Sequence, residues 1–312
     1  MVFLNAVQGV LTIFLLIGVG FYLSYKKWFD NKSRVLLSKL VTNVGLPAYM
    51  ISNLMSTYDR EKLLSYSGGL IIPFLTLTVG FLIAKILIPI LKIPDGRKGI
   101  FSSMFAFSNT IFVGLPVNMA LFGEKSLPFV LMYYIANTTL FWTIGSYVIS
   151  KDGGHEGKLF SKDSAKRIFS PPLLGFLVAL VLILMGIKLP NSAMDFCKYL
   201  GNLTTPLSML FVGIVIQNVK LRDIKLDIGM VAILFGRFIM SPCMVLLATF
   251  FIPVHDPLMR NVFVIQAAMP VMTQTSIIAQ NYDGDYEYAA IVTTLTTIVS
   301  LIAIPFYMII IS

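Results

Sequence analysis

Apolar stretches of about 20 residues recur along this chain, and they restrict its fold more than any other feature. A helix of that length crosses the hydrocarbon core of a bilayer, which is about 30 Å thick. Of the 312 residues, 57% are apolar and 12% are charged, and the mean hydropathy is +0.84. Because a soluble domain carries roughly a quarter charged residues, this composition excludes an ordinary cytosolic enzyme and indicates a multi-pass protein embedded in a lipid bilayer.

Ten such stretches can be drawn, so the sequence predicts an all-α protein with ten transmembrane helices. The stretches are 5–25, 36–57, 66–91, 99–122, 126–150, 170–188, 197–218, 228–252, 258–281 and 286–311. Most Lys and Arg residues fall in the loops after the first, third, fifth and seventh stretches. Since cytoplasmic loops are enriched in these residues, we expect a protein of the plasma or inner membrane with both termini outside. The same sidedness accounts for the net charge of +9, and no loop is basic enough to indicate a nucleic-acid partner.

An internal repeat divides the chain into two halves. The segments KLVTNVGLPAYM (39–50) and KYLGNLTTPLSM (198–209) share Lys, Asn, Pro and Met at equivalent positions. They lie an odd number of predicted helices apart, so the halves would cross the membrane in opposite senses. We therefore predict a first five-helix repeat over 1–150, a cytoplasmic linker over 151–169 and an inverted repeat over 170–312. Inverted repeats are typical of secondary transporters, whose substrate sites lie near the midplane where interrupted helices meet; the alternative is chance similarity between apolar segments.

The fourth and ninth stretches carry polar residues at mid-depth, together with glycine or proline. Our candidate substrate-binding residues come from these two centres: Ser108, Asn109, Thr110, Pro270, Thr273 and Gln274. Pro270 lacks an N–H group and breaks or kinks a helix, and it suits the first turn of a half-helix that begins near Val271. Two helix N-termini that meet at mid-depth would offer N–H groups and partial positive charge to an anion. The alternative is that the hydroxyl groups bond to their own helices and that the prolines are harmless kinks.

The second and seventh stretches contain a similar pattern. We interpret Gly45-Leu46-Pro47, beside Asn43, as a break in the second stretch, and Asn202 precedes Pro206 in the seventh. Polar groups and broken backbone at membrane depth are tolerated where protein or a watery cavity meets them. Asn43 and Asn202 are therefore further candidates for substrate binding. The sequence leaves open whether they line the same cavity or only fit the crossing helices together.

The motifs SNTIFVGLP (108–116) and AAMPV (267–271), together with NVGLPAYM in the second stretch, resemble the auxin efflux carrier family. This family includes plant auxin exporters and bacterial permeases for malate and similar organic anions, and the resemblance covers nearly the whole chain. It implies ten helices in two inverted repeats, with helices 4 and 9 unwound where they cross. This fold is similar to that of bile-acid sodium symporters and sodium/proton antiporters, in which a core domain moves like an elevator. By the same resemblance, Asn109 contacts the substrate carboxylate and Pro270 is the crossover proline of helix 9.

One position departs from the family pattern. Plant members have a proline where this chain has Ser108, so the break in helix 4 could instead depend on Gly114 and Pro116. The long hydrophilic loop of many plant members is also absent, and regulation by phosphorylation in that loop is not carried over.

The charged residues indicate what the site would hold. All Asp and Glu residues fall in loops or near span ends, whereas proton and sodium antiporters usually need an intramembrane carboxylate. We therefore expect anion transport by uniport, or with sodium or a proton as coupling ion, and no other cofactor and no metal. Arg237 lies well inside the eighth stretch. One interpretation is that Arg237 contacts the substrate or the interface along which the core domain moves. The alternative is that it pairs with backbone carbonyl groups or with lipid phosphate.

The function that fits these observations is secondary active transport of a small mono- or dicarboxylate. An anion channel and a membrane sensor that transports nothing are the alternatives. No HExxH, GxSxG or GxxxxGK[ST] motif is present, so we do not expect an enzyme. The expected partners are the organic anion, the lipid bilayer and, as one option, a second copy of the chain in a homodimer.

Overall fold

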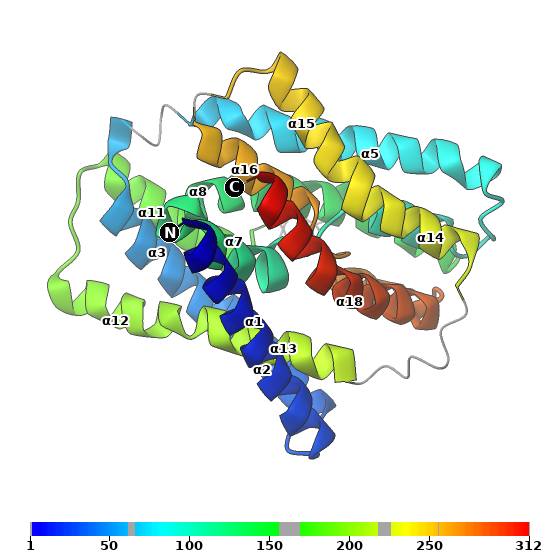
Figure 1. The fold of residues 1–312 in the computed structure, drawn as a ribbon, viewed down its shortest axis with the longest axis horizontal. Helices are drawn as coiled ribbons and strands as arrows, with labels where there is room; N and C mark the ends of the chain where they lie inside the picture. The colour runs from blue at the N-terminus through cyan, green and yellow to red at the C-terminus, as the bar shows by residue number, and fades with distance from the viewer. Residues whose placement is uncertain (1, 62–65, 156–168, 218–225, 255, 312) are drawn as a thin grey trace. The chain divides into compact units, whose positions relative to one another are not determined.

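The computed structural model describes residues 2–61, 66–155, 169–217, 226–254 and 256–311. Within these ranges the chain is helical and forms no β-strand, apart from an isolated antiparallel bridge between Ser108 and Val271. In chain order the elements are α1 Val2–Tyr25, α2 Asn31–Leu40, η1 Val41–Gly45, α3 Leu46–Thr57, η2 Ser67–Leu70, α5 Ile71–Ile90, α6 Lys98–Ala106, η3 Thr110–Gly114, α7 Leu115–Phe122, η4 Glu124–Ser126, α8 Leu127–Leu140, η5 Phe141–Gly145, α9 Ser146–Asp152, α11 Pro171–Leu184, α12 Asn191–Asn202, α13 Thr204–Gln217, α14 Ile228–Phe235, η7 Gly236–Met240, α15 Ser241–Phe251, α16 Pro257–Ala267, α17 Gln274–Asn281 and α18 Tyr286–Ile311 (Figure 1).

Six helical runs in the described ranges are long and apolar enough to cross a bilayer. They are Lys32–Thr57, Gly68–Ile90, Glu124–Asp152, Asn191–Gln217, Ile228–Phe251 and Tyr286–Ile311. These runs confirm the prediction of an all-helical, multi-pass membrane protein. Of the other predicted stretches, 5–25 coincides with the 24-residue α1, 170–188 with the shorter α11, and 99–122 and 258–281 with interrupted helices. Ten crossings in two inverted repeats stay a prediction.

Acidic side chains cap the N-termini of several helices just outside these runs. This agrees with the position of the Asp and Glu residues near the ends of the apolar stretches in the sequence. The backbone N–H of Ser33 donates to the Asp30 carboxylate at 2.7 Å, and that of Met230 donates to Asp227 at 2.7 Å. Such N-caps satisfy amide groups that the first helical turn leaves without partners. The hydrogen bond from Ser33 lowers the pKa of Asp30 below its ordinary value.

Three helical segments contain a π-helical turn that ends two residues before a proline. The turns are η1 before Pro47, η3 before Pro116 and η7 before Pro242. A proline cannot donate to the carbonyl group four residues back, and its ring crowds that group; the wider π-turn gives it room. Before Pro242, the carbonyl oxygen of Phe238 instead accepts a hydrogen bond from the Tyr307 hydroxyl at 2.5 Å. The chain therefore stays helical through all three prolines, and our interpretation of Gly45-Leu46-Pro47 as a break is wrong.

The chain divides into two packed units, each of which takes segments from both halves of the sequence. Unit 1 is Met1–Gly69, Leu115–Pro128 and Phe169–Asn218; unit 2 is Leu70–Gly114, Phe129–Ile168 and Val219–Ser312. The units thus cut across the predicted repeats 1–150 and 170–312. The repeats themselves stay a prediction, and most of the predicted linker 151–169 lies outside the described residues.

In unit 1, α1 packs along α13, and α3 packs against α11 and α12 (Figure 1). The first contact depends on small residues, because a Cβ atom on Gly213 would lie 2.3 Å from the carbonyl oxygen of Ile17. Likewise, a Cβ atom on Gly20 would lie 2.4 Å from the carbonyl oxygen of Leu210. The backbones of α1 and α13 therefore touch directly, as is common between helices in membranes.

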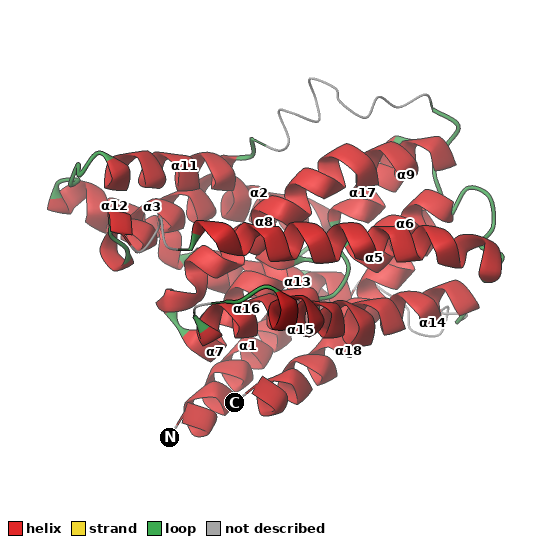
Figure 2. Ribbon diagram, turned by 90° about the horizontal axis from the view of Figure 1, so that it is seen from above, coloured by secondary structure: helices red, strands yellow, loops and turns green. Residues whose placement is uncertain are grey.

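In unit 2, α6 packs against α5 and α9, and α5 runs beside α15 (Figures 1 and 2). Aromatic rings fill the interior around α6: the ring of Phe107 stacks on that of Phe81 and meets that of Phe141 edge-on, with centroids 6.0 and 5.9 Å apart. The carboxylate of Asp152 accepts hydrogen bonds from the N–H groups of Gly99 and Ile100 at 2.9 and 2.8 Å. These contacts fix the position of α6, whose C-terminal end leads into the site described next.

Candidate substrate site at the helix crossover

Two helices of unit 2 break and pair with each other at mid-length. After α6 ends at Ala106, Phe107 adopts an extended conformation (φ −100°, ψ 137°), and α16 likewise ends at Ala267. The N–H of Asn109 donates to the carbonyl oxygen of Pro270 at 2.8 Å, and the N–H of Met272 donates to that of Phe107 at 3.3 Å. The two extended segments therefore cross antiparallel, and helix resumes at Thr110 in η3 and at Gln274 in α17.

Side chains from α8 and α18 satisfy the backbone groups that the crossover exposes. On α8, the buried Asn137 accepts from the N–H of Ser108 at 2.9 Å and donates to the carbonyl oxygen of Ser108 at 3.0 Å. On α18, the Thr296 hydroxyl accepts from the N–H of Val271 at 3.3 Å. A buried backbone group without a partner is costly, so Asn137 and Thr296 stabilise the extended segments.

Sequence reasoning missed both of these supporting residues. The available signal was the polar run Asn137-Thr138-Thr139 in the fifth stretch and the threonines in 293–297 of the tenth. The structure also corrects the expected place of Pro270, which lies in the extended segment four residues before α17 begins and not in the first turn of a half-helix. The break in helix 4 falls at Ser108, and not at Gly114 and Pro116, where the chain is helical. Ser108 has an N–H group that a proline would lack, and the side chain of Asn137 accepts a hydrogen bond from it.

The candidates from the fourth and ninth stretches come together at this crossover. The side-chain amide of Asn109 donates to the Thr273 hydroxyl at 2.7 Å, while its carbonyl oxygen accepts from the N–H of Phe112 at 3.1 Å. Ser108, Thr110 and Pro270 are buried beside it, and the carbonyl oxygen of Thr110 accepts from the side chain of Gln266 at 3.3 Å. Thr273 and Gln274 are half-buried at the start of α17, and the Thr273 side chain makes no capping hydrogen bond to the amides of that helix.

The other two candidates belong to unit 1 and do not form part of this cluster. Asn43 lies in η1 and Asn202 ends α12, and both side chains are exposed. Near them, the two helical runs contact each other through Gly45, where a Cβ atom would lie 2.8 Å from the Thr204 hydroxyl oxygen. Of the two roles that the sequence left open, the described contacts in unit 1 fit helix packing around Gly45, and substrate contact by Asn43 and Asn202 stays untested.

Arg237 is buried completely and bonds to the ends of both broken helices. Its guanidinium donates to the carbonyl oxygens of Ala106 at 2.8 Å, Ala267 at 2.6 Å and Met269 at 3.1 Å. Longer contacts of 3.4 Å reach the carbonyl oxygen of Phe105 and the hydroxyl of Ser241. Of the two alternatives for this residue, pairing with backbone carbonyl groups is therefore the one that the structure contains.

Among the residues whose burial is described, Arg237 is the only charged residue that is fully buried. In the same part of the chain, no group of three or more His, Cys, Asp or Glu residues is placed to hold a metal ion. An anion at the crossover would therefore meet amide and hydroxyl donors and no carboxylate.

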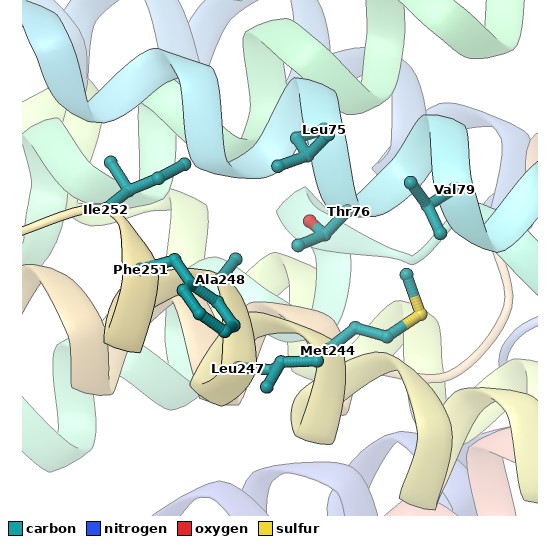
Figure 3. Close-up of a pocket in the computed structure, with 8 residues that line it drawn as sticks. All are labelled: Leu75, Thr76, Val79, Met244, Leu247, Ala248, Phe251 and Ile252. Carbon is teal, nitrogen blue, oxygen red and sulfur yellow. The ribbon is translucent and has the colours of Figure 1, made fainter.

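An apolar groove lies elsewhere on unit 2, between α5 and α15 (Figure 3). Its volume is about 270 Å³, and its lining residues are Leu75, Thr76, Val79, Met244, Leu247, Ala248, Phe251 and Ile252. It contains none of the candidate site residues. Both helices belong to runs long enough to cross a bilayer, and the lining is apolar apart from Thr76, so the groove offers an anion few polar partners and is not the candidate site.

Comparison with known proteins gives matches over nearly the whole chain. Residues 5–308 match the model of a family described as membrane transport protein, which is auxin-efflux-carrier-like. Two uncharacterized archaeal transporters are each 26% identical to the chain: one from Methanocaldococcus jannaschii, with 95% of both chains covered, and one from Methanothermobacter thermautotrophicus, with 98% and 99% covered. The protein named "Putative malonate transporter" of Rhizobium meliloti is 23% identical over 62% of this chain and 61% of its own length.

Proposed function

This chain belongs to the membrane transport protein family, and we propose that it is a secondary carrier of a small organic anion whose carboxylate binds at the crossover of α6 and α16. Transport as such follows from the family and from the transporter names of its relatives. The anion class is our inference, and the malonate-named relative supports it. The observation that carries the proposal is the pairing of Asn109 with Thr273 where two half-helices begin.

The chemistry of the crossover suits a carboxylate. The first amides of a helix have no partners within it, and its N-terminus carries about half a positive charge. The starts of η3 and α17 meet here through the Asn109–Thr273 hydrogen bond. The side-chain amide of Asn109 and the hydroxyl of Thr273 are donors that can turn from each other to carboxylate oxygens. Because no carboxylate of the described chain is buried beside them, an anion meets no repulsion from a fixed negative charge.

The division into units supports an elevator mechanism. Unit 2 holds both extended segments, the side chains that support them and Arg237. Unit 2 could therefore carry a bound anion as one body without breaking the crossover. We propose that the anion moves by uniport, or with sodium or a proton as the coupling ion bound through carbonyl and amide groups.

The test is uptake of radiolabelled malonate by proteoliposomes that contain the purified protein. We expect Asn109→Ala to lower uptake at least tenfold and Asn109→Asp to lower it further, because a carboxylate there would repel the substrate. The matched control is Asn53→Ala in α3, a buried asparagine of unit 1 whose side-chain atoms have no hydrogen-bond partner in the described structure. Full uptake by Asn109→Ala would remove Asn109 from the site.

The same vesicles separate a carrier from the alternatives. In vesicles preloaded with excess unlabelled malonate, with the membrane potential held at zero, a carrier transiently accumulates labelled malonate above its outside concentration, whereas a channel only equilibrates the label and a sensor shows no uptake. Uptake with and without sodium, and with and without a pH gradient, then identifies the coupling ion or shows uniport.

A further inference from the structure

We propose that Arg237 sets the charge selectivity of the crossover: its fixed charge neutralises the two negative helix ends there, so that an incoming ion meets only the positive ends. This inference rests on the proposed function, because it assigns the preference for an anion at the same site to one residue. Arg237 is a positioning and selectivity residue and not a substrate ligand, since its guanidinium nitrogens already bond to the carbonyl oxygens of Ala106, Ala267 and Met269.

The partners of Arg237 show which charge it balances. Ala106 and Ala267 are the last residues of α6 and α16, and their carbonyl oxygens lie 2.8 and 2.6 Å from the guanidinium nitrogens. A helix C-terminus carries about half a negative charge, since its last carbonyl groups have no partners within the helix. Two such ends together amount to roughly one negative charge, which one guanidinium can balance.

The positive ends have no such counter-charge. The described salt bridges of the chain involve Arg97, Lys98 and His155, so no carboxylate pairs with Arg237 or with the crossover. The starts of η3 and α17 therefore keep their partial positive charge. With Arg237 present, the four helix ends and the guanidinium together leave a net positive site. Without it, the negative ends of α6 and α16 would cancel that charge, and the preference for an anion would disappear.

The contact to Met269 explains how a residue that never touches the substrate can act on the site. The Nε group of Arg237 donates to the carbonyl oxygen of Met269. Met269 precedes Pro270, and the carbonyl oxygen of Pro270 accepts from the N–H of Asn109. The guanidinium thus lies one residue from the extended segment, close enough for a charge in a low-dielectric interior to act on a bound ion.

The test measures the electrostatic potential at the crossover and needs no knowledge of the substrate. In a background with Cys197→Ser and Cys243→Ser, Thr273→Cys supplies a single thiol at the start of α17. Its reaction rates are compared for two methanethiosulfonates of similar size, the anionic sulfonatoethyl and the cationic trimethylammonioethyl reagent. We expect the anionic-to-cationic rate ratio to fall about tenfold or more in Arg237→Gln, and to stay within about threefold of the parent in Arg237→Lys, which keeps the charge but not the planar fork.

A second pair of variants neutralises the charge while Arg237 keeps its bonds. The Ser241 hydroxyl lies 3.4 Å from a guanidinium nitrogen, so Ser241→Asp places a carboxylate beside it, and Ser241→Asn is the matched neutral control. The ratio should fall in Ser241→Asp and stay at the parental value in Ser241→Asn. This pair decides the question if Arg237→Gln does not fold.

Two outcomes would overturn the inference. If Arg237→Gln and Ser241→Asp keep the parental rate ratio, then Arg237 has only a structural role. If the rate ratio falls as far in Arg237→Lys as in Arg237→Gln, the planar geometry of the guanidinium matters and its charge does not. Malonate uptake, measured separately, tests the proposed function: a parent protein that takes up no malonate yet shows the charge-dependent ratio would contradict the substrate and leave the role of Arg237 intact.

Discussion

Two regions of this molecule each combine an asparagine and a proline at membrane depth, yet they fold differently. In unit 1, Asn43 and Pro47 lie in a helical run that stays continuous from Lys32 to Thr57. In unit 2, Asn109 and Pro270 lie in chain segments that leave the helix and cross. The asparagine of unit 1 is exposed, whereas that of unit 2 is buried and hydrogen-bonded to Thr273 and Phe112.

The difference teaches that a proline does not by itself break a membrane helix. Ahead of Pro47, the π-turn η1 makes room for the ring and the helix continues. A true break exposes backbone groups to a medium that cannot hydrogen-bond them, so it persists only where other side chains supply partners. In unit 2 those partners are Asn137, Thr296 and Arg237, which all come from other helices.

The largest effect that we predict tests this explanation through Asn137. Asn137→Leu should lower the free energy of unfolding by about 2–3 kcal/mol, because it leaves the buried N–H of Ser108 unpaired and removes one of the two donors to the carbonyl oxygen of Ser108, which keeps only the N–H of Thr110 at 3.0 Å. Thermal unfolding of the detergent-solubilised protein measures the loss.

The matched control is Asn53→Leu in unit 1. The side-chain amide of Asn53 is buried and has no hydrogen-bond partner among the described residues, so an apolar side chain of similar size should leave stability unchanged or raise it. Equal losses in Asn137→Leu and Asn53→Leu would contradict the view that the crossover depends on its supporting side chains.

A middle-sized effect distinguishes the two Gly-Leu-Pro sequences. At Gly114, a Cβ atom would lie 2.2 Å from the side-chain oxygen of Gln266, which is buried and bonded to Thr110. Gly114→Ala should therefore cost about 1–3 kcal/mol through overpacking and lower malonate uptake. At Gly45, the nearest atom is the Thr204 hydroxyl, which makes no hydrogen bond in the described structure and can rotate away.

We expect Gly45→Ala to change stability by less than about 1 kcal/mol, since alanine also favours the helix. The double variant Gly114→Ala/Gln266→Ala should recover part of the loss by removing the clash. If Gly45→Ala is as damaging as Gly114→Ala, the two π-turns are under equal constraint and the comparison fails.

The smallest effect concerns the ion pairs of Arg97 in unit 2. Arg97 bonds to Asp285 at 2.6 Å, lies 3.5 Å from Asp227 and stacks over the Tyr288 ring at 4.5 Å. Because these side chains are partly exposed, Arg97→Gln should cost at most about 1 kcal/mol. The difference in melting temperature between parent and variant should shrink at 1 M salt, where charges are screened; a loss that salt does not change would indicate that packing on Tyr288 dominates.

The predictable part of the site came from residue types that are expensive inside a membrane. Ser108, Asn109, Thr110 and Thr273 stood out because polar residues at mid-depth are costly unless they are paired. At the crossover, Asn109 and Thr273 pair through their side chains, whereas Ser108 and Thr110 bond through backbone groups. Asn137 and Thr296 carry the same signal, but they sit in helices without a break, where a hydroxyl or amide could equally bond its own helix. The same ambiguity applies to Asn43 and Asn202, whose contact with the substrate stays a prediction.

The sequence by itself determined that this protein is a multi-pass helical membrane protein, because the burial of apolar side chains in lipid depends only on the length and composition of each stretch. It also placed the two breaks near Asn109 and Pro270, because the effect of a proline or a polar residue on the backbone depends on the residues next to it in the chain. Only the tertiary structure decided which helices stay continuous, which side chains support the crossover and what Arg237 pairs with. Those outcomes depend on hydrogen bonds between residues far apart in the chain, such as Arg237 and Ala106, and no local pattern specifies such a partner.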